Sequence, residues 1–157
     1  MKKIIVLLLC LFIFTGCQSD DASLKLYNEM IDILNNAEDF STESKYFTST
    51  FEVTSTNDGL RYYIVIDNPT MAMYDVNVLA FEEGTNTNDE FAPNAGVFDS
   101  DINLVPNQIN KDKGFVKGIS ISGICTDTTK TILCLVQWKD EKNSKIYREF
   151  LKLNSNS

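Results

Sequence analysis

Apolar residues recur at helical spacing through residues 24–39. On a helical projection they occupy two adjoining quarters, and the opposite arc carries charged and amide side chains. The apolar positions are Leu24, Leu26, Tyr27, Met30, Ile31, Ile33, Leu34 and Ala37. This pattern predicts an amphipathic α-helix over 24–39. Its apolar half would either pack on the domain that follows or dock on a partner. Glu29 and Asp32 against Lys25 disfavour a membrane-surface helix.

The spacing changes from helical to alternating after residue 45. Short segments rich in β-branched and aromatic residues are separated by turn residues such as Asn57-Asp58-Gly59 and Asn68-Pro69. They cover residues 45–56, 60–67, 71–82, 96–105, 115–125, 131–139 and 145–153, and a polar loop spans 83–95. We therefore expect a mainly β fold: a seven-stranded antiparallel immunoglobulin-like sandwich over 45–157, preceded by one amphipathic helix.

The segments 115–125 and 131–139 are predicted to pair as a hairpin. In the register that a short loop sets, Gly123 faces Cys134, and one face of the pair is apolar throughout. The sulfur atoms of Cys125 and Cys134 are then diagonal neighbours. Two interpretations stay open: a disulfide between Cys125 and Cys134, or two buried thiols that pack as small apolar groups.

The first residues have the pattern of a secretory signal peptide. Lys2 and Lys3 precede an uncharged apolar run over 4–14, which is too short to span a membrane. The run leads into Phe14-Thr15-Gly16-Cys17, which resembles the lipobox of bacterial lipoprotein precursors. The resemblance implies that residues 1–16 are removed, that Cys17 receives a diacylglyceryl thioether, and that the lipid anchors the protein to the outer face of the cell membrane. An ordinary secretory signal followed by an unrelated cysteine is the alternative.

Such a cleavage affects both the charge and the compartment. The full chain has 14 basic and 22 acidic side chains and a net charge of −8; without Lys2 and Lys3, 12 basic side chains remain and the charge is −10. An acidic chain is repelled by phosphate backbones and anionic headgroups, so we expect no nucleic-acid partner and a membrane contact made by the lipid. Residues 17–23 would form the lipidated cysteine and its tether. The remaining cysteines would lie outside the cytoplasm, where a disulfide persists.

A second resemblance covers roughly residues 60–120. The sequence YYIVIDNP at 62–69 ends a strand at an Asn-Pro turn, YDVNV at 74–78 begins the next strand, and LVPNQ at 104–108 precedes a later one. These segments are similar to the core of FxLYD-like and related immunoglobulin-like domains of bacterial lipoproteins. The resemblance implies a fold and an envelope setting, and it implies no reaction.

Candidate catalytic chemistry is sparse because the chain has no histidine. Ser-His-Asp and Cys-His mechanisms and histidine-ligated zinc are therefore excluded, and no motif singles out a carboxylate pair. We expect no enzyme activity and no cofactor. Asp99, Asp101 and Asn103 alternate like the first ligands of an EF-hand loop and form an incomplete calcium candidate, since Leu104 and Asn110 stand where that loop needs glycine and glutamate.

Two further clusters have both a structural and a functional interpretation. Met71 and Met73 would either fill the core or offer thioether ligands to Cu(I). An aromatic set would either fill the core or stack on a glycan. Its members are Tyr62, Tyr63, Tyr74 and Trp138.

Together these features predict a non-enzymatic, lipid-anchored extracytoplasmic protein. Its function would be that of a binding or accessory module for a protein partner in the envelope or at the surface. We expect the contact to be made by the loop 83–95 and the N-terminal helix, because long polar loops on a rigid sandwich are common recognition sites. The alternative is a surface lipoprotein that binds a ligand or ion, such as calcium or a glycan.

Overall fold

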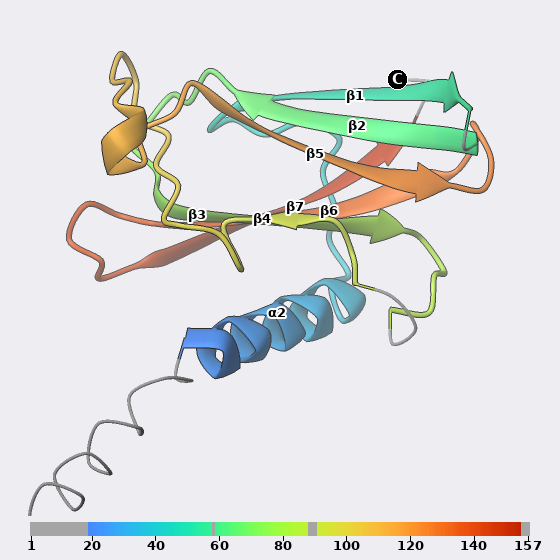
Figure 1. Ribbon diagram of the computed structural model, residues 1–157, viewed down its shortest axis with the longest axis horizontal. Helices are drawn as coiled ribbons and strands as arrows, with labels where there is room; N and C mark the ends of the chain where they lie inside the picture. The colour runs from blue at the N-terminus through green and yellow to red at the C-terminus, as the bar shows by residue number, and fades with distance from the viewer. Residues whose placement is uncertain (1–18, 58, 88–90, 155–157) are drawn as a thin grey trace, which may run out of the picture.

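The computed structural model describes residues 19–57, 59–87 and 91–154. Its elements are α2 (Ser19–Asn35), β1 (Thr48–Thr56), β2 (Gly59–Asp67), β3 (Tyr74–Glu82), β4 (Asn94–Ala95), the 3-10 turn η1 (Lys111–Lys113), β5 (Gly118–Cys125), β6 (Thr131–Lys139) and β7 (Ile146–Asn154). Figure 1 shows that α2 lies beneath two stacked sheets. The predicted signal peptide 1–16 and Cys17 lie outside the described residues.

The strands of the described residues form two antiparallel sheets. One has the order β1-β2-β5 and the other the order β4-β3-β6-β7. The hairpins β1–β2 and β6–β7 keep one register along their length, whereas the chain changes sheet between β2 and β3, between β4 and β5, and between β5 and β6. This connectivity is that of an immunoglobulin-like sandwich in which β4 pairs with β3. The predicted fold class, a mainly β sandwich of seven antiparallel strands preceded by one helix, is confirmed.

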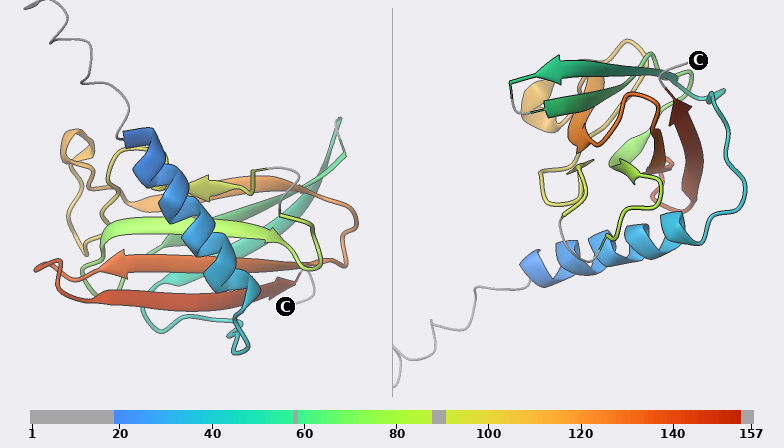
Figure 2. Two further views of the ribbon diagram at one scale, coloured as in Figure 1. Left: turned by 90° about the horizontal axis from the view of Figure 1, so that it is seen from below. Right: turned by 90° about the vertical axis from the view of Figure 1, so that its right-hand side faces the viewer.

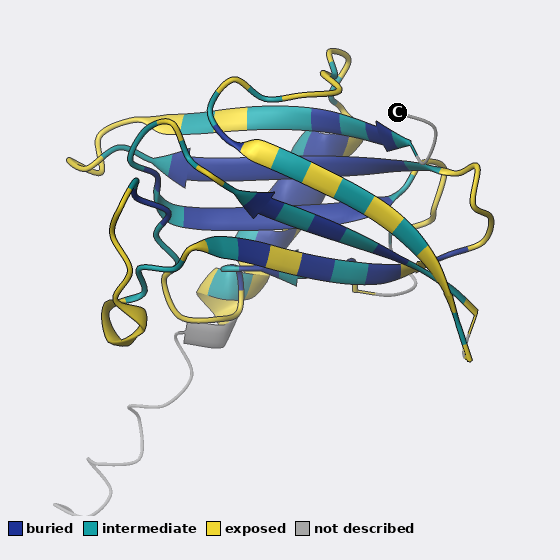
Figure 3. Ribbon diagram, turned by 90° about the horizontal axis from the view of Figure 1, so that it is seen from above, coloured by how far each residue is buried: buried dark blue, intermediate teal, exposed yellow. Residues whose placement is uncertain are grey.

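The first core lies between the two sheets. Strands of the three-stranded sheet alternate between better-covered and more exposed positions, because only one face of that sheet is covered (Figure 3). The largest fully buried side chains of this core include Trp138, Tyr62 and Met73. The core therefore consists of the apolar side chains that alternate with polar ones along the strands, as the sequence pattern predicts.

A second core lies between α2 and the outer face of the four-stranded sheet (Figure 2). From α2, Tyr27, Met30, Ile31 and Leu34 are at most 8% exposed. They pack on a sheet face formed by Leu79, Phe81, Leu133 and Leu135. Of the two interpretations of the apolar half of the helix, the one in which it packs on the domain is therefore confirmed.

The helix is longer at its start and shorter at its end than the pattern predicts. It begins at Ser19, so most of the predicted tether 17–23 is helical, and it ends at Asn35 rather than at residue 39. Two groups of Asn36 donate hydrogen bonds to the carbonyl oxygen of Asp32: the side-chain amide at 2.7 Å and the backbone N–H at 3.1 Å. These bonds close the last turn of the helix.

The predicted hairpin of 115–125 with 131–139 is wrong. β5 pairs with β2, and β6 lies in the other sheet between β3 and β7. The loop between β5 and β6 crosses from one sheet to the other, so Gly123 faces Tyr62 and not Cys134. Alternation could not separate these cases, because two strands that face each other across a core present the same apolar positions as two paired strands.

The predicted strand over 96–105 is also wrong. Within the described residues this part of the chain forms a ladder with β3 only at Asn94–Ala95 and then turns at Gly96, where φ is +77°; farther on, Ile102 accepts one hydrogen bond from the N–H of Val76 in β3. A side chain at Gly96 would collide with the backbone carbonyl of Val76 in β3, so this turn beside the sheet needs glycine. The following segment is held by isolated bridges such as that of Leu104 with Met73.

Candidate functional site

An exposed aromatic cluster lies where α2 meets the segments on either side of β4. Phe91 is 67% exposed and Phe98 is 46% exposed. The centres of their rings lie 5.8 Å apart, and they lie 4.9 Å and 5.7 Å from the ring of Tyr27. We refer to Tyr27, Phe91 and Phe98 as the aromatic surface.

The helix holds this surface in place. Tyr27 is 4% exposed, and its hydroxyl oxygen accepts a hydrogen bond from the backbone N–H of Ala92 at 2.7 Å. Near the other end of α2, the amide of Asn35 donates to the hydroxyl of Thr87 at 3.4 Å. The two segments that the sequence offered as contact candidates, the helix and the loop 83–95, therefore meet on one side of the molecule.

Exposed phenylalanine rings are unusual because they carry no polar group that water can bind. Each square ångström of apolar area that a partner covers stabilises a complex by roughly 25 cal/mol before association costs are counted. Aromatic groups are accordingly enriched in the centres of protein–protein contacts. Phe91 and Phe98 have the exposure that such a contact requires, and both rings lie against the buried ring of Tyr27.

The solvent-facing arc of α2 is acidic and lies away from the arc that carries Tyr27. Asp21, Glu29 and Asp32 are exposed on α2, where Lys25 is the sole basic residue. Arg148 of β7 lies 3.9 Å from the carboxylate of Glu29, with both side chains largely in water, so this pair contributes little. A partner that also reached this outer arc of α2 would be favoured if it carried basic residues there.

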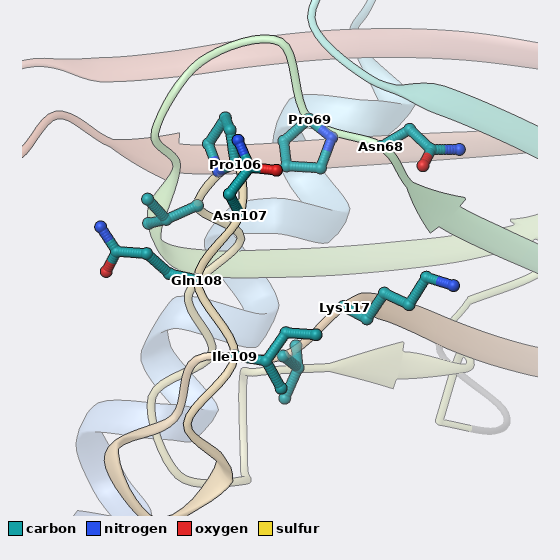
Figure 4. A pocket seen from close by; sticks show the side chains of 9 residues that line it. Asn68, Pro69, Pro106, Asn107, Gln108, Ile109 and Lys117 are labelled. Atoms are coloured by element: carbon teal, nitrogen blue, oxygen red, sulfur yellow. The ribbon is translucent and has the colours of Figure 1, made fainter.

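A pocket of about 410 Å³ lies at one end of the sandwich (Figure 4). Pro69 and Pro106 form one side and Ile109 the other, while Asn68 and Lys117 lie at its open margin. Its lining residues include neither a carboxylate nor an aromatic ring. This composition suits a small molecule with an apolar body and oxygen acceptors, and it suits neither calcium nor a stacked sugar.

The calcium candidates do not converge on one point. The Asp99 carboxylate accepts the N–H of Gly96 at 3.4 Å, and the amide oxygen of Asn103 accepts the N–H of Asp75 at 3.1 Å. Asp101 is exposed. In residues 19–57, 59–87 and 91–154, no group of three or more His, Cys, Asp or Glu side chains is placed to hold a metal ion. Asp99 and Asn103 instead hold backbone turns beside β3.

Cys125 and Cys134 are free thiols in the structure and lie in different sheets. Both are buried in the core between the sheets, and both lie close enough to Tyr62 to act on its hydroxyl electrostatically. Burial raises the pKa of Cys134 to about 12 and also raises the pKa of Cys125, to which Glu82 and Asp127 add. Buried thiols of this kind are poor nucleophiles. A disulfide formed outside the cytoplasm stays a prediction, and it would join the two sheets.

The other candidate clusters belong to the core only in part: Met71 packs against the core, and Tyr63 and Tyr74 are half-buried and lie outside it. Met73, Tyr62 and Trp138 are at most 1% exposed, so they cannot form a copper-binding or sugar-stacking surface. Trp138 packs between Tyr46 and Tyr147, at ring distances of 5.4 Å and 5.5 Å. The structural interpretation is confirmed for Met73, Tyr62 and Trp138.

The sequence pattern did not single out Phe91 and Phe98. Phe91 follows a run of polar residues in the loop 83–95, and Phe98 lies in the segment that was expected to be a strand. A lone phenylalanine in an otherwise polar loop is the one local signal. Its contact with Tyr27, more than sixty positions earlier, depends on the fold.

Within the described residues, no helix has the length and apolarity needed to cross a membrane. Comparison with protein-family models, with curated proteins and with solved structures gave no match. The resemblances to lipoprotein precursors and to FxLYD-like domains stay predictions.

Proposed function

We propose that this protein is a non-enzymatic binding module, anchored by a lipid on Cys17 to the outer face of the bacterial cell membrane, that contacts a protein partner in the envelope through the aromatic surface. The observation that carries the proposal is the pair of exposed phenylalanines, Phe91 and Phe98, on the buried support of Tyr27. Both rings already lie against the ring of Tyr27, so a partner would meet an aromatic surface that is assembled before the contact forms.

The charge of the protein favours a basic partner. The net charge is −8, and Asp21, Glu29 and Asp32 make the outer arc of α2 acidic. Long-range attraction between the two surfaces would raise the association rate, and salt would weaken it. The aromatic rings would supply most of the affinity.

The predicted anchor limits where that partner lies. Helix α2 begins two residues after Cys17, and two extended residues span about 7 Å at most. Tyr27 is about 12 Å farther along the helix. An anchored protein would therefore hold the aromatic surface close to the membrane, within reach of an integral or lipid-anchored partner.

Site-specific photocrosslinking in the producing cell tests the proposal. We expect Phe98→benzoylphenylalanine to give one discrete protein adduct in the membrane fraction. The same residue at Ile124, which is 65% exposed on β5, serves as the matched control and should give no such adduct. Adding Phe91→Ser to the position-98 variant should remove the adduct, because the rings act as one surface. An identical adduct from both positions, or none from position 98, would contradict the proposal.

The end pocket supports a second candidate, a ligand-binding lipoprotein. Asn68 and Asn107 both line the pocket with left-handed backbone, at φ of +48° and +61°, which a rigid binding loop can use. Short-chain carboxylates are the probes that suit Lys117 and the apolar wall. A thermal shift of several degrees that Ile109→Asp abolishes would favour this function.

A further inference from the structure

The sheet edges of this protein are not equally protected. β4 has two residues, and β7 is covered by Ser41, whose N–H donates to Phe150 and whose carbonyl accepts from Lys152, both at 2.9 Å. The segment before β4 lies beside β5, where Pro93 approaches Gly123. β1, by contrast, pairs with β2 alone, and no backbone hydrogen bond of the described residues joins its outer edge to another segment.

β1 also lacks the features that keep edge strands from pairing. It is nine residues long, and its register with β2 contains no bulge. Its sequence, TSTFEVTST, contains neither proline nor lysine. Natural sheets use such residues, short strands or bulges to block an exposed edge. An edge of this length without them is a template for another strand.

The side chains of β1 define what that strand would be. Phe51 and Val53 point toward the core between the sheets. They are only half-buried, because β2 lies on one side of β1 and no strand covers the other side. Thr50, Glu52 and Thr54 alternate with them on the exposed face (Figure 3). A strand with apolar residues opposite Phe51 and Val53 would complete the burial of those two side chains, and a basic residue would match Glu52.

A second copy of this chain does not meet these requirements. In the antiparallel register with the longest overlap, Glu52 would lie opposite the Glu52 of the other copy. Like charges directly opposite each other destabilise a strand pair, and both copies carry a net negative charge.

We propose that β1 binds an extended segment of another protein by β-strand addition, and that this segment alternates apolar residues with polar ones and carries lysine or arginine opposite Glu52. The backbone of β1 supplies the hydrogen bonds, Phe51 and Val53 the apolar contact, and Glu52 the charge preference. This surface is separate from the aromatic surface, because β1 and α2 lie on opposite sides of the molecule (Figure 1).

The test uses synthetic peptides and the purified full chain in detergent. The probe is acetylated, amidated Ser-Thr-Val-Lys-Val-Thr-Ser, and its partner probe has glutamate in place of lysine. We expect the lysine peptide to slow amide exchange in β1 and to bind about tenfold more tightly than the glutamate peptide. Glu52→Lys should reverse this preference. Glu149→Lys on β7, the matched control, should leave it unchanged.

Two further arms separate strand addition from other binding. N-methylation of the peptide amides that face β1 should abolish binding, whereas methylation of the outward amides should not. Phe91→Ser should leave peptide binding to β1 intact. This variant therefore separates a failure of the proposed function, which rests on the aromatic surface, from a failure of the proposed strand addition at β1. The absence of binding at about 1 mM lysine peptide, or a preference that Glu52→Lys does not alter, would overturn the proposal.

Discussion

Tyr62 and Gly123 join the two sheets at the level of single residues. Tyr62 lies on β2, and its hydroxyl donates a hydrogen bond to the carbonyl oxygen of Ala80 on β3, at 3.2 Å across the core. Burial raises the pKa of this hydroxyl, so it stays protonated and able to donate. The ring passes over Gly123, its direct partner on β5, where a side chain would collide with it. The absence of a side chain at position 123 therefore makes room for a contact between the sheets.

We expect Gly123→Ala to destabilise the protein by about 1–3 kcal/mol, because the added methyl group has to displace the Tyr62 ring or the adjacent Pro93. Urea denaturation followed by the fluorescence of Trp138, which is fully buried, measures the change. Ser122→Ala on the same strand is the control and should change stability by less than about 0.5 kcal/mol. Equal stabilities of the two variants would show that the ring has room to move.

At the scale of elements, Glu82 fixes the loop that carries the chain from one sheet to the other. Its carboxylate, at the end of β3, accepts hydrogen bonds from the backbone N–H and the hydroxyl of Thr126, both at 2.9 Å, and Lys130 lies 3.4 Å away. Partial burial alone would raise the pKa of Glu82. The hydrogen bonds and the Lys130 charge outweigh it and hold that pKa below its ordinary value.

A carboxylate with a lowered pKa stabilises the fold when it is ionised. Its contribution is complete above the ordinary glutamate pKa of about 4.5 and is lost as the pH falls through the lower pKa of the folded state. We expect Glu82→Gln to cost about 1–2 kcal/mol at pH 7, with the difference from the parent shrinking as the pH falls below about 4.5. Glu83→Gln, at an exposed pair with Lys152, is the control and should have little effect. A cost that does not vary with pH would exclude this account.

Helix α2 is an integral layer of the fold. It covers the outer face of β3 and β6, which are buried on both faces as a result. A helix in this position removes apolar area from water on a sheet face that most sandwiches leave exposed. The domain therefore depends on residues that precede the first strand by more than ten positions.

Met30→Ala tests this dependence. Met30 lies on the face of α2 that packs on the sheet and is fully buried. We expect the substitution to lower the free energy of unfolding by about 2–5 kcal/mol, with one cooperative transition. Leu24→Ala, at a position that is 42% exposed on the same helix, should cost much less. Two separate transitions in the parent protein would show instead that the helix and the sandwich unfold independently.

At the scale of the whole molecule, the proposed anchor and the two proposed contact surfaces are arranged around a three-layered body. The aromatic surface lies where the helix layer meets the segments beside β4, while β1 lies on the opposite side (Figures 1 and 2). The acidic net charge opposes direct contact with an anionic bilayer, so anchoring depends on the lipid. Such a body could contact a membrane-associated partner on one side and an extended segment on the other.

Replacing the anchor atom tests the localisation. We expect Cys17→Ser to lose metabolic labelling by a clickable fatty acid and to shift the protein from the membrane fraction to the medium, because two or three acyl chains bind a bilayer durably and a serine receives none. Cys125→Ser, at a buried core thiol, is the matched control and should keep the label. Equal labelling and equal retention of the Cys17→Ser variant and the parent would exclude lipid anchoring through this residue.

Local sequence determined the identity of most elements. The 3.6-residue spacing of Tyr27, Ile31 and Leu34 fixes a helix with one apolar side, and the alternation along β2 and β5 fixes strands with one covered face. The turn residues Asn-Asp-Gly and Asn-Pro fix where β2 begins and ends. These features depend on backbone geometry within a few residues, which is why they can be predicted without the fold.

The tertiary structure alone decided which elements meet. The sequence of β6 is apolar at nearly every position because α2 covers its second face. The change of sheet between β5 and β6 cannot be predicted from the residues near it. The turn at Gly96 needs glycine because of a close approach to β3, a contact between distant residues. The aromatic surface and the open edge of β1 arise in the same way, since exposure is set by what the rest of the chain covers and not by the residue itself.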